Sequence, residues 1–201
     1  MSTEDYLKDI TEIKDMMNKS SRFFSLSGLS GILAGGYAII GAAIAYYLVS
    51  ISGIDYVIAE GKIFNYILID LVAVALLSII TGIILSNRKA KQNNETLWNG
   101  TSKRLLTAFL IPLVTGGIFI IIKVYNHHYG LTGSLMLIFY GLALVNASKY
   151  TIGNVKYLGY AEIILGLVCS VFPNYGFWFW VLGFGIMHIV YGSLIYLKHD
   201  R

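Results

Sequence analysis

Six long apolar runs dominate the chain, and short polar segments separate them. The runs cover residues 26–49, 63–85, 105–122, 131–147, 155–172 and 177–197. Most of them approach the roughly 20 apolar residues that an α-helix needs to cross a bilayer. The pattern therefore predicts an all-α integral membrane protein with a six-transmembrane-helix bundle over residues 25–201. The connections are short, so no second folded domain is expected between the spans.

Residues 1–24 are predicted to form a separate element, a cytoplasmic amphipathic helix. Leu7, Ile10, Ile13 and Met17 recur at spacings of three and four, which places them on one face of a helix. The segment mixes acidic and basic residues, unlike the basic start of a cleavable signal peptide. Two interpretations stay open, namely that this helix packs on the inner ends of the spans or that it binds a cytoplasmic protein partner.

The lysines and arginines support this topology. With the N-terminus placed inside, thirteen of the 15 basic residues fall in inner segments, and only Lys62 and Lys123 fall outside. Such a split follows the positive-inside rule, and removing one span would invert every later loop. Both termini are therefore expected in the cytoplasm, and the compact loops favour a bacterial inner (plasma) membrane. The inner basic residues are Lys8, Lys14, Lys19, Arg22, Arg88, Lys89, Lys91, Lys103, Arg104, Lys149, Lys156, Lys198 and Arg201.

Composition agrees with a membrane protein and argues against several other classes. Hydrophobic residues make up 56% of the chain and charged residues only 13%, about half of the roughly 25% found in soluble domains. The net charge of +4 comes from residues in the connections, so it indicates contact with the headgroups of the lipid bilayer rather than with nucleic acid. Cys169 is the single cysteine, which excludes an intramolecular disulfide and a cysteine-rich metal site.

Small residues indicate how the spans pack. Gly31 and Gly35 form a GxxxG pair in the glycine-rich first run, which predicts close contact with another helix. Pro112 lacks a backbone N–H and is expected to kink the third span. The dipeptide Tyr-Gly occurs in the fourth run as Tyr140-Gly141 and in the sixth as Tyr191-Gly192. We call this weak internal similarity the Tyr-Gly repeat, and either a duplicated hairpin or chance would explain it.

Three ionisable residues inside the runs are the candidate intramembrane polar site: Asp70, Glu162 and His188. Ionisable groups in a span are costly and usually face the bundle interior. Only a few residues join the fifth and sixth runs, so Glu162 and His188 are expected at similar depth on neighbouring helices. Such a pair can take up and release a proton near neutral pH. Alternatively, the pair only cross-links two helices, and Asp70 only accepts hydrogen bonds from nearby hydroxyls.

No catalytic motif of a protease, hydrolase, nucleotide-binding or redox enzyme was found, so we expect neither an enzyme nor a bound cofactor or metal ion. The leading hypothesis is passage of a proton or small solute past Glu162, His188 and Asp70. Six short spans leave little room for a wide pore, so a channel would need a homo-oligomer. The alternative is a membrane-embedded regulatory or stress-response protein that acts through residues 1–24 and the basic loop 87–104.

Overall fold

The computed structural model describes residues 27–52, 61–92, 98–151 and 155–199, and this part of the chain is helical without a strand. The predicted helix of residues 1–24 lies outside it. Five separate helices come first: α2 (Gly28–Ser52), α3 (Lys62–Gln92), α4 (Gly100–Tyr125), α5 (Thr132–Ala147) and α6 (Val155–Val171). A short 3₁₀ turn, η1 (Ser148–Tyr150), follows α5. The last run forms consecutive segments: η2 (Pro173–Tyr175), α7 (Gly176–Trp180), the π-helical η3 (Val181–Met187) and α8 (His188–His199).

The six apolar runs coincide with these helices, although α3 and α4 extend further than the apolar residues. The helix α3 continues to Gln92, and its last turn contains Lys89 and Lys91. Cations near a helix C-terminus are favoured by the helix dipole, so the helix persists beyond its apolar part. The helix α4 begins early because the side chain of Asn99 accepts a hydrogen bond from the backbone N–H of Ser102 at 2.8 Å.

Four helical stretches are long and apolar enough to cross a membrane: Gly28–Ile51, Lys62–Gln92, Gly100–Tyr125 and Pro173–Lys198. The helices α5 and α6 have 16 and 17 residues, which is shorter than the roughly 20 residues of an upright span. The structure therefore confirms an all-helical protein with four helices suited to a bilayer. The count of six spans stays a prediction.

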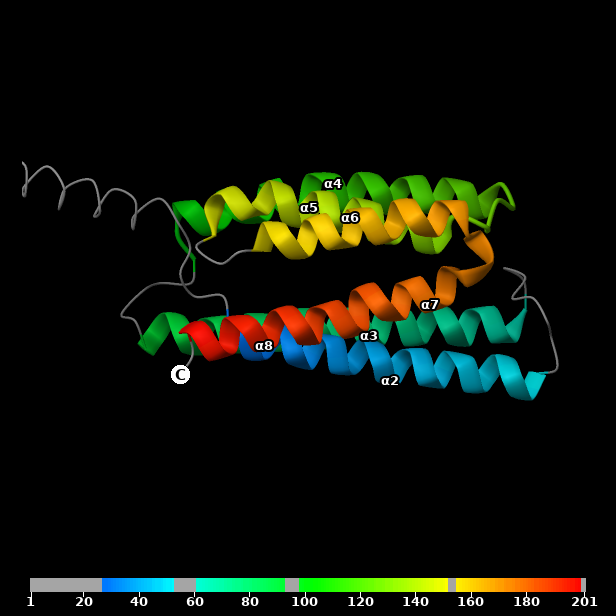
Figure 1. Cartoon of the computed structure of the whole chain (residues 1–201), viewed down its shortest axis with the longest axis horizontal. Helices are drawn as coiled ribbons and strands as arrows, with labels where there is room; N and C mark the ends of the chain where they lie inside the picture. Colours follow the sequence, from blue (N-terminus) through cyan, green and yellow to red (C-terminus); the bar gives the residue numbers. More distant parts are fainter. Residues whose placement is uncertain (1–26, 53–60, 93–97, 152–154, 200–201) are drawn as a thin grey trace, which may run out of the picture.

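The helices form two layers (Figure 1). One layer holds α4, α5 and α6, and the other holds α2, α3 and the consecutive segments α7, η3 and α8, which we call the C-terminal helix. The turn η2 carries the chain between the layers at one end of the bundle. Successive helices run in opposite directions, so the starts of α2, α4 and α6 lie beside the ends of α3, α5 and α8. We call this side the basic end, because all described basic residues except Lys62 and Lys123 belong to it: Arg88, Lys89, Lys91, Lys103, Arg104, Lys149, Lys156 and Lys198.

Glycines bring α2 and α8 into close contact. A Cβ atom at Gly35 would lie 2.5 Å from the carbonyl oxygen of Gly185 and 3.0 Å from the backbone nitrogen of Ile189. At Gly31 it would lie 3.1 Å from the Cα of Gly192. The predicted GxxxG pair therefore does allow two helix backbones to approach, as short side chains do in membrane bundles.

The helices α5 and α6 repeat the same contact. A Cβ atom at Gly166 would lie 2.9 Å from the carbonyl oxygen of Ser134 and 3.0 Å from the backbone nitrogen of Ile138. The Ser134 hydroxyl also donates a hydrogen bond to the Gly166 carbonyl at 2.7 Å. Positions 159, 162 and 166 in α6 have the spacing of 28, 31 and 35 in α2, but residue 162 is glutamate where residue 31 is glycine.

The proline in α4 is compensated by α5. Because Pro112 has no N–H, the carbonyl of Ala108 lacks the donor that an α-helix places four residues later. The side-chain amide of Asn146 in α5 donates to this carbonyl at 2.7 Å. Neighbouring helices commonly satisfy a backbone group that proline frees inside a membrane. This bond therefore fixes α5 against α4.

Candidate functional site

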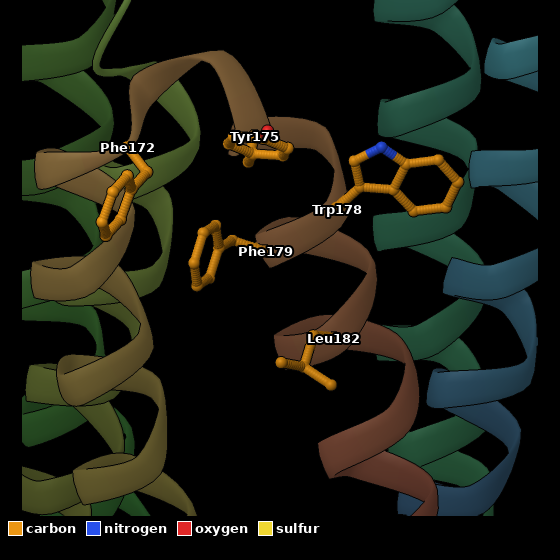
Figure 2. A pocket seen from close by; sticks show the side chains of 5 residues that line it. All are labelled: Phe172, Tyr175, Trp178, Phe179 and Leu182. Carbon is orange, nitrogen blue, oxygen red and sulfur yellow. The ribbon is translucent and has the colours of Figure 1, made fainter.

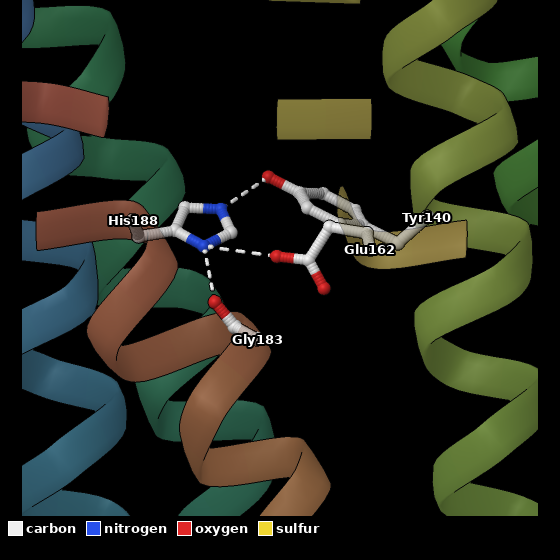
Figure 3. A network of polar contacts seen from close by, with 4 residues as sticks. All are labelled: Tyr140, Glu162, Gly183 and His188. Atoms are coloured by element: carbon white, nitrogen blue, oxygen red, sulfur yellow. Dashed lines mark hydrogen bonds and ion pairs between the residues drawn. The ribbon is translucent and has the colours of Figure 1, made fainter. Parts of the chain in front are cut away.

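A buried polar centre lies where the two layers meet. It combines Tyr140 of α5, Glu162 of α6, Gly183 of η3 and His188 at the start of α8 (Figure 3). Glu162 has an exposed fraction of 0% and His188 of 7%. The first two residues come from one layer and the other two from the opposite layer, so the centre exists only when the layers are packed together.

The imidazole of His188 is held at both nitrogens. Its Nδ1 lies 3.0 Å from the carbonyl oxygen of Gly183, and its Nε2 lies 2.7 Å from the hydroxyl of Tyr140. A carbonyl oxygen can only accept, so the hydrogen must be on Nδ1. In the neutral ring Nε2 then accepts the hydrogen of the Tyr140 hydroxyl. The environment therefore selects one tautomer of His188.

The carboxylate of Glu162 is enclosed and incompletely satisfied. Its Oε1 lies 3.6 Å from Nδ1 of His188, too far for a hydrogen bond but close enough for an ion pair if the imidazole is protonated. Neither carboxylate oxygen has a hydrogen-bond partner among the residues that the structure describes. Leu137 of α5 is fully buried and packs nearby. A buried carboxylate without partners is costly, and an ionisable group inside a span is a candidate for a functional role.

Aromatic rings surround the imidazole. Phe184 stacks on His188 with ring centroids 6.0 Å apart, and it also contacts Tyr140 at 5.0 Å and Trp180 at 5.1 Å. These rings exclude water from one side of the centre. Electrostatic interactions inside such a shell are stronger than at a surface.

An apolar pocket of about 340 Å³ lies between α6 and the C-terminal helix (Figure 2). Phe172, Tyr175, Trp178, Phe179 and Leu182 line it, and Phe179 points toward α6. Leu182 directly precedes Gly183, so the pocket and the polar centre share one stretch of helix. The pocket opens away from the basic end, at the end where η2 joins the layers.

Comparison of the chain with protein-family models finds no match. No curated protein and no solved structure is significantly similar to it. Within the described residues, no group of three or more histidine, cysteine, aspartate or glutamate side chains is placed to hold a metal ion.

The three residues singled out from the sequence do not form one site. Glu162 and His188 lie together, whereas the Asp70 carboxylate lies against α2, where a Cβ atom at Gly41 would be 3.1 Å from its Oδ2. The Asp70 side chain is partly exposed, whereas Glu162 is completely buried, so the two carboxylates lie in different environments.

Two members of the centre had no predicted role in it, Tyr140 and Gly183. Tyr140 belongs to the Tyr-Gly repeat. Tyr140 and its counterpart Tyr191 both pack against one buried apolar cluster, which includes Leu144. The Tyr191 hydroxyl is buried, and none of the described residues forms a hydrogen bond with it. The Tyr-Gly repeat could therefore have pointed to Tyr140 as a member of the centre. Both of its tyrosines lie near His188, and the glycines that follow them, Gly141 and Gly192, make close helix contacts.

Proposed function

We propose that this protein passes protons across a membrane through Tyr140, His188 and Glu162. The observation that carries this proposal is the Glu162 carboxylate, which is fully buried, lacks a hydrogen-bond partner within the described part of the chain and lies 3.6 Å from His188 Nδ1. In this proposal all six helices cross the bilayer, with the basic end in the cytoplasm and the chain in a bacterial inner membrane. Loop charge supports that orientation.

The order of contacts suits a relay. His188 takes a proton at Nε2, on the side of Tyr140, and gives up the proton on Nδ1 to Glu162 when the 3.6 Å between Nδ1 and Oε1 shortens to hydrogen-bond distance. The carboxylate receives this proton and becomes neutral, which removes its unfavourable buried charge. One proton enters the imidazole at Nε2 and one leaves it at Nδ1, so the ring is neutral again but carries its hydrogen on Nε2. Before the next proton passes, the ring must rotate to return a hydrogen to the Nδ1 side, and the Tyr140 hydroxyl must regain the proton that it gave up.

The same geometry favours a proton over a larger solute. Glu162 has no exposed surface, and Leu137 and the helix η3 pack directly against it. A proton moves between groups in contact without needing an open pore. The proposal therefore requires no homo-oligomer, and Asp70 is not part of the route.

The test is proton flux into liposomes that contain the purified protein, driven by a potassium diffusion potential and followed with an internal pH-sensitive dye. Glu162→Gln keeps the size of the side chain but cannot bind and release a proton, so flux should fall to that of protein-free liposomes. Asp70→Asn is the matched control and should retain wild-type flux. The proposal is wrong if wild-type protein gives no flux above protein-free liposomes, or if Glu162→Gln conducts like wild type.

The regulatory alternative is supported by a different observation. Arg88 and Lys91 are exposed near the end of α3, and Lys103 and Arg104 are exposed near the start of α4, all at the basic end. Such a surface suits an acidic protein partner, which electrostatic attraction would steer toward it. A protein that carries no flux but binds an acidic cytoplasmic partner, with binding weakened by Arg88→Gln and Arg104→Gln, would favour regulation over transport.

A further inference from the structure

The Glu162 carboxylate occupies the place of a missing side chain. A Cβ atom built on Gly183 would overlap Glu162 Oε2, and it would lie 3.3 Å from Glu162 Cδ and 2.5 Å from Leu137 Cδ2. The carboxylate therefore approaches η3 only because residue 183 is glycine. Any larger residue there would push the Glu162 side chain, or the whole of α6, away from the C-terminal helix.

The backbone of Gly183 acts on the histidine at the same time. Its carbonyl oxygen accepts from His188 Nδ1 at 3.0 Å, across a separation of five residues. Residues Val181–Met187 are π-helical, with a wider turn than an α-helix, and His188 is the first residue after them. Short π-helical stretches often occur at functional sites, since the wider turn changes which groups face one another. Gly183 thus contacts both partners of the pair, the glutamate through space and the histidine through its carbonyl.

We propose that Gly183 is the positioning residue of this centre. Because residue 183 has no side chain beyond a hydrogen atom, the Glu162 carboxylate has room beside His188. The Gly183 carbonyl keeps the imidazole hydrogen on Nδ1, the ring nitrogen nearer to that carboxylate. The role in conduction rests on the function proposed above, whereas the role in arranging the two side chains does not. The neighbouring Gly185 belongs to the same π-helical segment but faces Ile39 of α2, so it provides a matched control.

The first experiment reads the arrangement without any transport. The protein is labelled with ¹⁵N-histidine in lipid nanodiscs, and the His188 signals are identified by their loss in His188→Gln. Wild-type protein should show the hydrogen on Nδ1 of His188. Gly183→Ala should shift this signal toward the other tautomer or toward a mixture, while Gly185→Ala should leave it unchanged. An unchanged His188 spectrum in Gly183→Ala overturns the proposal.

The second experiment uses rescue by a shorter acid. Gly183→Ala should lose flux, and so should Glu162→Asp, because its carboxylate is one carbon further from His188. In the double variant the shorter side chain relieves the clash with the carboxylate, although Leu137 still lies against the new methyl group. Gly183→Ala should therefore cost less stability in the Glu162→Asp background than in the wild-type protein. If Gly183→Ala by itself does not fold, folding of the double variant supports the proposal. An equal cost of Gly183→Ala in both backgrounds, or failure of both the single and the double variant to fold, contradicts it.

The two proposals fail in different ways. Wild-type protein without flux refutes proton passage, yet the histidine spectra and the stability of the double variant still decide the role of Gly183. Conversely, flux that depends on Glu162 but persists in Gly183→Ala, together with unchanged His188 spectra, refutes only the positioning role.

Discussion

The hydrogen bond between Asn146 and Ala108 offers a test of how α4 and α5 are held together. Asn146→Leu removes the donor at 2.7 Å and leaves the Ala108 carbonyl without a partner, because Pro112 supplies no N–H. An unsatisfied buried carbonyl costs about 1–3 kcal/mol, and interhelical hydrogen bonds in membranes reach about 1.7 kcal/mol. We therefore expect Asn146→Leu to lower the free energy of unfolding by about 1–2 kcal/mol.

Pro112→Ala provides the decisive background for this test. Alanine restores the N–H at position 112, so the Ala108 carbonyl regains a donor within α4 and no longer depends on α5. In this background Asn146→Leu should cost less than about 0.5 kcal/mol, which is a coupling between the two positions of about 1 kcal/mol.

The free energies would be measured by reversible unfolding of the four proteins in mixed detergent micelles. Thr115→Val serves as the control, because the Thr115 hydroxyl also donates to a carbonyl of α4, that of Ile111 at 2.8 Å, but this carbonyl can keep its backbone donor. This control should be nearly neutral. An equal cost of Asn146→Leu with and without Pro112 would refute the compensation argument.

Three further predictions concern packing and burial. Gly35→Ala places a methyl group 2.5 Å from the backbone oxygen of Gly185 in η3, about 0.9 Å closer than ordinary contact, whereas Gly36→Ala meets no described atom within 4 Å. Gly35→Ala should therefore be less stable than Gly36→Ala in unfolding measurements by about 1–3 kcal/mol. Equal stability of the two variants would contradict the assigned face of α2. Ser134→Ala loses its 2.7 Å hydrogen bond to α6 and should lower the unfolding free energy by about 1 kcal/mol; no change would mean that this bond adds nothing. Tyr191→Phe removes a buried hydroxyl that has no partner among the described residues, so this variant should be neutral or stabilising in thermal unfolding. Tyr140→Phe instead breaks a hydrogen bond to His188 and should lower the unfolding free energy by about 1 kcal/mol. Similar losses in both variants would mean that the Tyr191 hydroxyl has a hydrogen-bond partner.

Much of the fold could be predicted because its signals are local. Long apolar runs must become helices in a membrane, since a helix satisfies every backbone polar group within one segment. The helices accordingly begin and end near the predicted boundaries. The glycines of α2 also predicted close packing against another helix, and Gly31 and Gly35 do contact α8. The sequence did not show which helix they would meet, because small residues indicate close approach without naming the partner.

The centre shows the opposite case. Hydropathy and charge alone marked Asp70, Glu162 and His188 as unusual, because an ionisable group inside an apolar run stands out wherever it lies. The short connection between α6 and α7 also placed Glu162 and His188 on neighbouring helices. Asp70 was grouped with them for its chemistry, but it lies against Gly41 of α2. Depth along a span can be counted from the sequence, whereas the direction in which a side chain points around the bundle cannot.

The sequence by itself determined an all-helical protein with helices apolar enough to cross a membrane, the approximate positions of these helices and the identity of two buried ionisable residues. These properties follow from hydrophobic length and from the cost of burying charge, which depend on composition and order along the chain. Only the tertiary structure decided that Tyr140 and Gly183 complete the centre and that Asp70 does not. Those contacts join residues from different layers, so they depend on how helices rotate and pack, and packing is set by the shapes of all the neighbouring side chains together.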